Sequence, residues 1–482
     1  MSASELAPEL AYVPAFNLAR RIAARDLSAV EVMRATLARI EKLQPALNCF
    51  ITVCAEDALR DADTLDQRIA RGEDVGPLGG VPLHVKDLVD TAGVRTTFGS
   101  FMHEHNVPKT DAVAVARLKK SGAVLMGKTT TPEFGHMVWT EAPLFGRTPN
   151  AWDATRTSGG SSGGAAVACA AGLGPIGIGT CAGGSTRIPA ACNGVVGFKQ
   201  SLGLIPHDMA AESFANMSYI TPMTRTVLDT AMMLEAMAGP HPADVHSFNM
   251  SARGCVDAVL SARDLKGLRI AWRPFLGNTV IDSEVVRLTQ SAAQVFQQFG
   301  ATMHEMRDDM EPTEPMWLVL STALWNARLS HLLPEWQSRM SPTLVRQMQG
   351  GASHSAEALQ RAYLNRTELY RKIQGWFDHA DIIVMPTLTR TAVPLQEALF
   401  EPIEIEGKEI DTVRKAWFPY THPFNLSGNP AVTLPAGFHS DGLPVGIQLV
   451  ARRGADALLC RAAALFEQER PWADVRPKLV GV

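Results

Sequence analysis

Residues 157–199 read TSGGSSGGAAVACAAGLGPIGIGTCAGGSTRIPAACNGVVGFK, and this stretch decides the fold of the chain. The small residues of GGAAVACAAG (163–172) predict a short, closely packed helix, and PIGIGT (175–180) predicts a buried strand. Glycine and serine cluster on both sides of this unit, at 157–164 and at 183–185. A helix followed directly by a buried strand is typical of an α/β fold.

The same alternation of helices and strands continues along the rest of the chain. Ser28 and Glu31 have the spacing of a capping box at the start of a helix, whose apolar face is formed by Val30, Met33, Leu37 and Ile40. Further helices are predicted at 55–70 and 111–122, and strands at 83–90, 123–128, 381–387, 430–437 and 445–451. Together these elements predict an α/β fold with a largely parallel or mixed sheet.

Residues 311–377 differ from the rest of the chain in pattern and composition. Their apolar spacing is mostly helical, strand signals are lacking, and tryptophan is frequent. We interpret this region as a helical insertion near the mouth of the active site, and a peripheral helical layer is the alternative. No internal repeat or low-complexity linker divides the sequence. We therefore expect one domain over residues 1–482, with an N-terminal helical segment at 1–75 and a core at 76–240 that carries the glycine–serine clusters.

The overall composition argues against several classes of protein. The formal charge of −4 and the pI near 6.4 provide no positive field that would attract a nucleic acid. The N-terminal sequence does not read as a secretory signal, and no run of about 18 apolar residues would span a membrane. The seven cysteines have no zinc-binding spacing, so we expect reduced, mostly buried thiols. We expect a cytoplasmic protein that binds neither nucleic acid nor membrane.

The glycine–serine clusters suggest either a phosphate site or a serine nucleophile. A glycine-rich loop before a helix can bind phosphate, but the phosphate-loop motif needs Lys and Ser or Thr where this chain has Ala165 and Ala166. A serine nucleophile remains, and its hydroxyl needs a base to remove the proton. Ser185 lacks the GxSxG context, and no histidine lies within twenty residues of it in the sequence.

Two kinds of base can remove the proton of such a serine. A lysine can serve if it is desolvated, since burial lowers its pKa toward neutrality. Lys86 is the best candidate, because it stands alone in the apolar segment LHVKDLV (83–89). The other kind is a histidine that is distant in sequence and close in space, such as His84, His136 or His422.

At this point the sequence resembles a known family, the amidase signature hydrolases, which include bacterial aryl acylamidases, nylon-oligomer (6-aminohexanoate cyclic dimer) hydrolases and urethanases. The resembling segments are GGVPLHVKDLVDTAGVRTTFGS (79–100), GAVLMGKTTTPEFG (122–135), the stretch at 157–199, GPHPAD (239–244), DIIVMPT (381–387) and PFNLSGNPAVTLPAG (423–437). The resemblance implies a large central mixed β-sheet flanked by helices on both faces. It also implies a hydrolase of carbon–nitrogen bonds other than peptide bonds, in linear amides, with no metal and no organic cofactor.

The resemblance further implies a Ser–cisSer–Lys triad that works through an acyl-enzyme. Ser185 matches the nucleophile, Ser161 matches the bridging serine that the family holds on a cis peptide bond, and Lys86 matches the base. We expect Ser162 and Thr180 to support the triad. The backbone N–H groups expected to form the oxyanion hole are those of Ala182, Gly183, Gly184 and Ser185.

The substrate is less well defined by the sequence. We expect a hydrophobic or aryl amide, and carbamates are cleaved by the same acylation chemistry. Large apolar residues are candidates for the pocket, with plain core as the alternative, namely Met137, Trp139, Trp325 and Phe418. The resemblance also implies a homodimer.

A second function shares the triad, that of the glutaminase component of a tRNA-dependent amidotransferase. Members of that class commonly carry Gln before Pro where this chain has Ile188 and Pro189, which favours a free-standing amidase. Another departure from the family pattern is Cys181, at a position where many relatives carry Asp, so that Arg187 needs a different partner. We interpret Cys181 as a small buried filler, because no cationic neighbour is evident and buried cysteines are usually inert.

Overall fold

The computed structural model describes residues 10–307 and 310–478 of the chain. Residues 1–9, the beginning of the expected N-terminal helical segment, lie outside the described residues. The central feature of the structure is an eleven-stranded sheet in the order β1-β3-β2-β6-β8-β7-β14-β15-β11-β9-β10. The pairs that β2 forms with β3 and β6, and that β9 forms with β10 and β11, are parallel, and the others are antiparallel. The sheet is therefore mixed.

The strands are short, and most are buried along their whole length. The strands of the large sheet are β1 Phe50–Val53, β2 Pro82–Lys86, β3 Val124–Thr129, β6 Ile176–Thr180, β7 Val196–Lys199, β8 Ile220–Thr224, β9 Arg269–Trp272, β10 Thr302–Glu305, β11 Ile382–Pro386, β14 Ala431–Phe438 and β15 Pro444–Ala451. Two small hairpins are formed by β4 Glu141–Ala142 with β5 Gly146–Arg147, and by β12 Pro402–Ile405 with β13 Lys408–Thr412.

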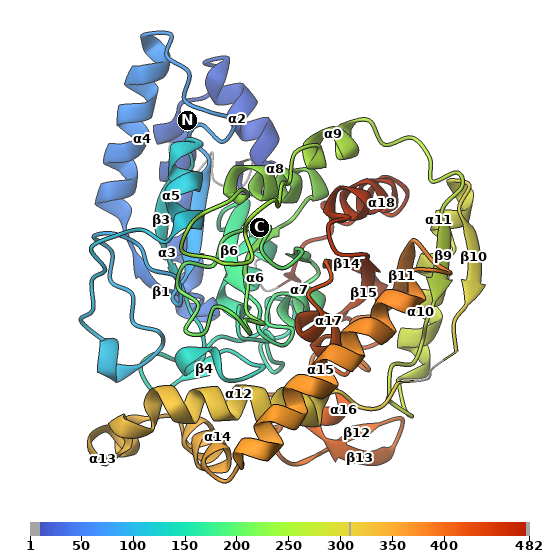
Figure 1. The fold of residues 1–482 in the computed structure, drawn as a ribbon. Coiled ribbons are helices and arrows are strands. Elements are labelled where there is room, and N and C mark those ends of the chain that lie inside the picture. The colour runs from blue at the N-terminus through green and yellow to red at the C-terminus, as the bar shows by residue number, and fades with distance from the viewer. Residues whose placement is uncertain (1–9, 308–309, 479–482) are drawn as a thin grey trace.

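Helices cover both faces of the sheet, as the resemblance implied (Figure 1). The α-helices are α2 Ala15–Ala23, α3 Ala29–Leu47, α4 Ala55–Ala70, α5 Val113–Lys120, α6 Gly163–Ala170, α7 Arg187–Asn193, α8 Val227–Met237, α9 Cys255–Leu260, α10 Ser283–Ala293, α11 Val295–Gln298, α12 Glu314–Leu329, α13 Leu333–Trp336, α14 Pro342–Ala352, α15 Ala356–Trp376, α16 Val413–Ala416, α17 His422–Ser427 and α18 Asp456–Glu469. Short 3-10 turns are η1 Phe101–His103, η2 Glu133–Gly135, η3 Ser330–Leu332 and η4 Gln337–Arg339.

Local sequence signals account for several of these elements. Ser28 caps α3 with the predicted capping box: its Oγ accepts from Glu31 N at 3.0 Å, and Glu31 Oε2 accepts from Ser28 N at 2.8 Å. The prediction of a strand through Asp90 was wrong, because β2 ends at Lys86 and the chain turns there, with Val89 N donating to Lys86 O. This turn places Lys86 at the edge of the sheet.

Helices α12 to α15 form a layer of their own along the lower side of the molecule in Figure 1, within residues 314–376. The helix α12 packs on α14 and α15, and α15 packs on α17. Among the described residues, no helix is both long and apolar enough to cross a membrane. All seven cysteines are free, and all but Cys54 are buried, as the sequence predicts.

Candidate active site

The parallel strands β2 and β6 bring Lys86 and Thr180 together. Each residue is the last of its strand, and the register pairs Val85 with Ile178 just before them. Lys86 Nζ lies 2.8 Å from Thr180 Oγ1. Because neighbouring parallel strands end at the same edge of a sheet, this edge is a place where functional side chains from distant parts of the sequence can meet.

Two serines at the start of α6 contact the same amine. Ser162 is the N-cap residue of α6, and the peptide bond between Gly160 and Ser161 is cis. Lys86 Nζ lies 2.7 Å from Ser161 Oγ and 2.9 Å from Ser162 Oγ. The three side chains bonded to the amine are therefore all hydroxyl groups, which can both donate and accept a proton.

The Lys86 side chain is fully buried. Burial lowers the pKa of Lys86 well below its ordinary value, and Cys181 acts weakly in the opposite direction. No carboxylate of the described residues is bonded to this amine. Since a buried ammonium without a carboxylate partner is costly, this environment favours the neutral amine.

The loop from Ala182 to Ser185, between β6 and α7, is anchored by its carbonyl groups. Each of the four carbonyl oxygens accepts a hydrogen bond from another part of the protein. The four bonds are Trp317 Nε1 to Ala182 O (2.9 Å), Thr421 Oγ1 to Gly183 O (2.6 Å), Ile188 N to Gly184 O (2.8 Å) and Ser162 N to Ser185 O (3.1 Å).

The N–H groups of the same four residues donate to no protein acceptor in the part of the chain that the structure describes. Glycine is required at Gly184, where φ is +141° and a Cβ atom would lie 2.4 Å from Thr421 Oγ1. A Cβ at Gly183 would lie 2.8 Å from the Trp317 ring. The loop thus holds at Ser185 a row of donors that are unpaired within the described residues, and two of its residues, Ala182 and Ser185, line a cavity.

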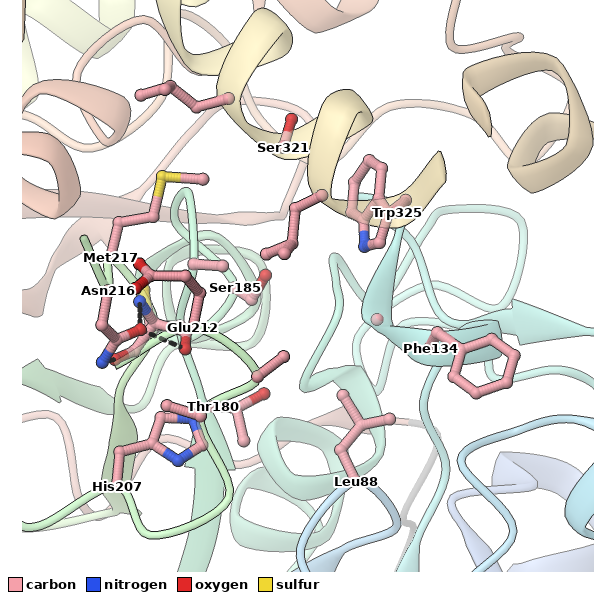
Figure 2. A pocket seen from close by; sticks show the side chains of 18 of the residues that line it. Leu88, Phe134, Thr180, Ser185, His207, Glu212, Asn216, Met217, Ser321 and Trp325 are labelled. Atoms are coloured by element: carbon pink, nitrogen blue, oxygen red, sulfur yellow. Dashed lines mark hydrogen bonds between the residues drawn. The ribbon is translucent and has the colours of Figure 1, made fainter. Parts of the chain in front are cut away.

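Ser185, Ser161 and Thr180 line one cavity of about 290 Å³. Figure 2 shows Ser185 near the middle of this cavity, facing Trp325 and Ser321 from α12. One further wall is the loop at 207–218, and another is largely apolar, with Leu88, Phe98 and Phe134. The cavity has about the size of a small-molecule site.

Of the four predicted pocket residues, only Trp325 lines this cavity. Phe418 is buried and its ring packs against His422 and Trp417, at centroid distances of 5.0 and 6.1 Å. Trp139 packs on the same apolar cluster as Phe418, and Met137 is buried beside Thr343, whose Oγ1 lies 3.6 Å from its sulfur. Phe418 and Met137 are thus buried and Trp139 is partly buried, and none of the three lines the cavity.

Most residues of the cavity wall were not predicted from the sequence. Helix α12 presents one stripe of residues to the cavity at helical spacing, namely Trp317, Leu320, Ser321, Leu324, Trp325 and Arg328. The spacing of three and four residues was visible in the sequence, but the same spacing also describes a helix that packs on a core. His207 and Met209, on the opposite wall, lie in a loop without any periodic signal.

The three distant histidines do not line the cavity. His84 is buried with its Nε2 3.5 Å from Cys169 Sγ, and His136 bonds to Glu133 O and Thr343 Oγ1. Burial lowers the pKa of His422 to about 3, and its ring packs against Trp317 at 5.0 Å. No group of His, Cys, Asp and Glu residues in the described chain has the arrangement of a metal site.

Cys181 has a cationic neighbour, contrary to our interpretation from the sequence. Arg187, which is also fully buried, places Nη2 3.7 Å from Cys181 Sγ, and its charge lowers the pKa of this thiol against the opposing effect of burial. Arg187 also donates to Gln448 Oε1 at 2.6 Å, Thr421 O at 3.0 Å and Asn425 Oδ1. These neutral oxygens are the different partners that Arg187 was expected to need with Cys181 in place of Asp.

Comparisons with known proteins show the family to which the chain belongs. The family model "Amidase" matches residues 31–460. An acylamidase from Rhodococcus erythropolis is 38% identical over an alignment of 479 positions, which covers 97% of this chain and 98% of that protein. A component of the glutamyl-tRNA(Gln) amidotransferase from Carboxydothermus hydrogenoformans is 33% identical over 497 residues, covering 98% of this chain and all of that protein (100%).

Solved structures extend the likeness to the whole fold. A bacterial aryl acylamidase of the amidase signature enzymes superposes with a TM-score of 0.91 at 28% identity, over 98% of this chain and 99% of that one. The 6-aminohexanoate cyclic dimer hydrolase, in complex with its substrate, gives 0.87 at 27% identity over the same shares. The predicted fold class is confirmed. The chain belongs to the amidase family and is a hydrolase that acts on amide carbon–nitrogen bonds.

Proposed function

We propose that this amidase uses Ser185 as its nucleophile, Ser161 as a proton relay and Lys86 as the base, on hydrophobic or aryl acyl amides. The observation that supports this proposal best is the buried Lys86 amine, whose three bonded side chains are all hydroxyls. A neutral amine in this position has a lone pair available for the Ser161 proton. Ser162 and Thr180 hold the amine in place from the other sides.

Acylation begins with attack of Ser185 Oγ on the carbonyl carbon of the amide. As the new C–O bond forms, Ser185 gives its proton to Ser161, and Ser161 gives its own proton to Lys86. The tetrahedral intermediate then collapses. The C–N bond breaks, the leaving nitrogen receives the proton back along the same path, and the acyl group remains as an ester on Ser185.

The available N–H groups of Ala182 to Ser185 support an oxyanion hole in this reaction. Negative charge develops on the carbonyl oxygen during attack, and donors that are already fixed stabilise it without reorganisation. Anchoring of the four loop carbonyls explains how the donors stay in position. In deacylation, water attacks the ester, its proton passes through Ser161 to Lys86, and Ser185 leaves with a proton.

The cavity wall favours an apolar acyl or amine group. Leu88, Phe134 and Trp325 provide contact surface for an aliphatic chain or an aryl ring. Carbamates enter the same acylation path, because their carbonyl carbon is attacked in the same way. We therefore include carbamates as secondary substrates of the site.

A substrate panel tests the proposal. The purified chain is incubated with anilides, aliphatic amides, esters and carbamates, in parallel with the Ser185→Ala variant. We expect hydrolysis of anilides by the wild type and only background rates for Ser185→Ala, together with fluorophosphonate labelling of the wild type alone. Full activity of Ser185→Ala would refute the assignment of the nucleophile.

The same panel separates the second candidate function. Relatives named as components of the glutamyl-tRNA(Gln) amidotransferase match the chain over its full length, which is the reason to test it. Glutamine is added as a substrate, with and without charged tRNA. Glutaminase activity that depends on added partner proteins and tRNA, with no anilide hydrolysis, would favour the amidotransferase and contradict the free-standing amidase.

A further inference from the structure

The helix α12 spans the cavity from the reaction centre to its mouth. At one end, Trp317 bonds to the carbonyl of Ala182 in the loop that carries Ser185. At the other end, Arg328 lines the same cavity eleven residues further along the helix. This separation corresponds to about 16 Å along the helix axis. The two ends of the cavity can therefore contact two different parts of one substrate.

The guanidinium of Arg328 has no partner in the described part of the chain, where it forms no hydrogen bond, ion pair or stacking contact, although it lines the cavity. Its side chain remains accessible to solvent, yet the surrounding wall removes enough water to lower the pKa of Arg328. By contrast, Arg366 on α15 donates to three backbone carbonyls, those of Leu426, Ala215 and Asn216. An unpaired, partly desolvated guanidinium is suited to bind a carboxylate.

His207 is a second polar group on this wall with an unused atom. Its Nδ1 atom is buried and has no hydrogen-bond partner within the described residues, and the side chain lines the cavity (Figure 2). Burial lowers the pKa of His207 to about 4, with Asp244 opposing this shift and the charge of Arg328 adding to it. The ring is therefore a neutral imidazole near Arg328, which can donate one hydrogen bond to an anion.

Glu212 is an acidic group on the same wall, but its charge is already compensated. Its Oε1 accepts from Phe214 N at 2.9 Å, and its Oε2 accepts from Ala215 N. Arg366 also lies near enough for Glu212 to affect its pKa. Arg328 is thus left as the charged group of the wall without a compensating partner among the residues that the structure describes.

We propose that Arg328, assisted by His207, binds a carboxylate at the far end of the substrate, so that the preferred amides end in a carboxylate remote from the scissile bond. This inference rests on the proposed function, because Ser185 defines the other end of the site. The apolar residues between the two ends, such as Leu324 and Trp325, contact the chain or ring that joins the amide to the carboxylate.

Matched substrates test this inference. One series contains mono-4-nitroanilides of α,ω-dicarboxylic acids of increasing length, with the methyl esters of the same compounds as neutral partners. A second series carries the carboxylate in the leaving group, as N-acyl aminobenzoates, and a third series ends in an ammonium group. We expect a carboxylate preference at one chain length, and the first two series show whether the acyl or the amine part reaches Arg328.

Variants then assign the preference to the residue. Arg328→Gln is expected to reduce kcat/KM for the preferred carboxylate substrate by about 10- to 100-fold, and to reduce kcat/KM for the neutral ester partner much less. Arg328→Lys should restore part of the preference. The matched control is Arg361→Gln, since Arg361 is an exposed arginine paired with Glu357 and does not line the cavity.

A binding measurement separates this inference from the proposed function. Titration of the carboxylate anilide into Ser185→Ala protein reports binding without turnover, and Arg328→Gln in that background should weaken the binding by a similar factor. An unchanged carboxylate preference in Arg328→Gln, or a preference for neutral or ammonium-ended substrates at every length, would overturn the role of Arg328. Lack of any anilide hydrolysis by the wild type would instead overturn the proposed function.

Discussion

Two fully buried lysines lie on neighbouring strands of the sheet and have opposite surroundings. Lys86 ends β2, and Lys128 lies on β3, where the parallel register pairs it with Val85. Because side chains alternate along a strand, the two lysines point to opposite faces of the sheet. Lys86 contacts Ser161, which lines the cavity. Lys128 contacts the backbone of the turn that follows β2, at Val89 O.

The partners of the two amines differ in what they can do with a proton. Lys128 donates to Val89 O, Thr91 Oγ1 and Thr96 Oγ1, and Asp87 and Asp90 are near enough to hold its pKa at about 8 against the effect of burial. A carbonyl oxygen only accepts a hydrogen bond, and the two carboxylates favour the charged form of Lys128. Burial is therefore common to both lysines. The side chains bonded to Lys86 are all hydroxyls, and this difference supports the role proposed for Lys86 as the base.

The largest expected effect is the loss of activity when the amine is removed from β2. Lys86→Ala should lower kcat/KM by about 10²- to 10⁴-fold, the usual contribution of a general base. Lys128→Ala should change kcat/KM by less than about tenfold, because its amine does not reach the reaction centre. Initial rates on an anilide, corrected for the folded fraction by circular dichroism, measure both. Equal losses in the two variants would remove the distinction between the lysines.

The pH dependence of the rate is the second test. In the proposed mechanism the active form of Lys86 is the neutral amine, so kcat/KM should rise about tenfold per pH unit below the pKa of Lys86 and level off above it. Since burial lowers this pKa well below its ordinary value, the plateau should be reached well below pH 10.5. The profile of Lys128→Met should keep the same inflection. An inflection that disappears in Lys128→Met would show that the wrong lysine was assigned.

The sequence pointed to one of these lysines and not to the other, for a physical reason. Lys86 was recognised because the whole segment around it matches a family pattern, and because one lysine in an apolar strand predicts desolvation. Lys128 has the same local appearance in AVLMGK. Only the fold reveals that Asp87 and Val89 O lie near its amine, and those contacts come from residues about forty positions away.

Contacts between residues that are distant in the sequence also limit how much of the fold and of the cavity can be predicted. Strands with continuous apolar runs, such as β11 and β15, were predicted from sequence. β8 was not, since it has Pro222 in its interior, which weakens a strand signal. Likewise, apolar size does not separate a core residue from a cavity residue. Phe418 is core, whereas Trp317 lines the cavity and bonds to Ala182, which is 135 residues away in the sequence.

Stability gives a third and smaller contrast between the lysines. A lysine whose pKa is lower in the folded state costs stability as the pH falls below its unfolded value of about 10.4, by about 1.4 kcal/mol per pH unit, until the folded pKa is reached. Methionine carries no such cost. The free energy of unfolding of Lys128→Met relative to wild type should therefore rise by about 3 kcal/mol as the pH falls from 10.4 to 8, and then stay constant.

Lys86→Met should show the same kind of dependence. Its free energy of unfolding relative to wild type should rise as the pH falls below about 10.4, because burial lowers the pKa of Lys86, and it should become constant at the folded pKa of Lys86. Urea unfolding of the three proteins at several pH values measures both curves, and the shape of each curve is independent of packing changes that do not titrate. A Lys86→Met curve that levels off at pH 8 or higher would mean that the hydroxyl partners do not distinguish the two amines.

The smallest expected effect comes from removing one hydroxyl at a time from each amine. Thr180→Val deletes the oxygen 2.8 Å from Lys86 Nζ, and Thr91→Val deletes the oxygen 3.0 Å from Lys128 Nζ, with little change of shape in either case. An ammonium needs more acceptors than a neutral amine, so Thr180→Val should shift the inflection of the pH–rate profile to lower pH. Because the amine then has one hydrogen bond fewer to fix its position, the plateau value of kcat/KM should also fall by about three- to tenfold. Thr91→Val should leave the inflection and the plateau unchanged, and a shift in both variants would mean that the profile reports the stability of the sheet edge as a whole instead of the proton on Lys86.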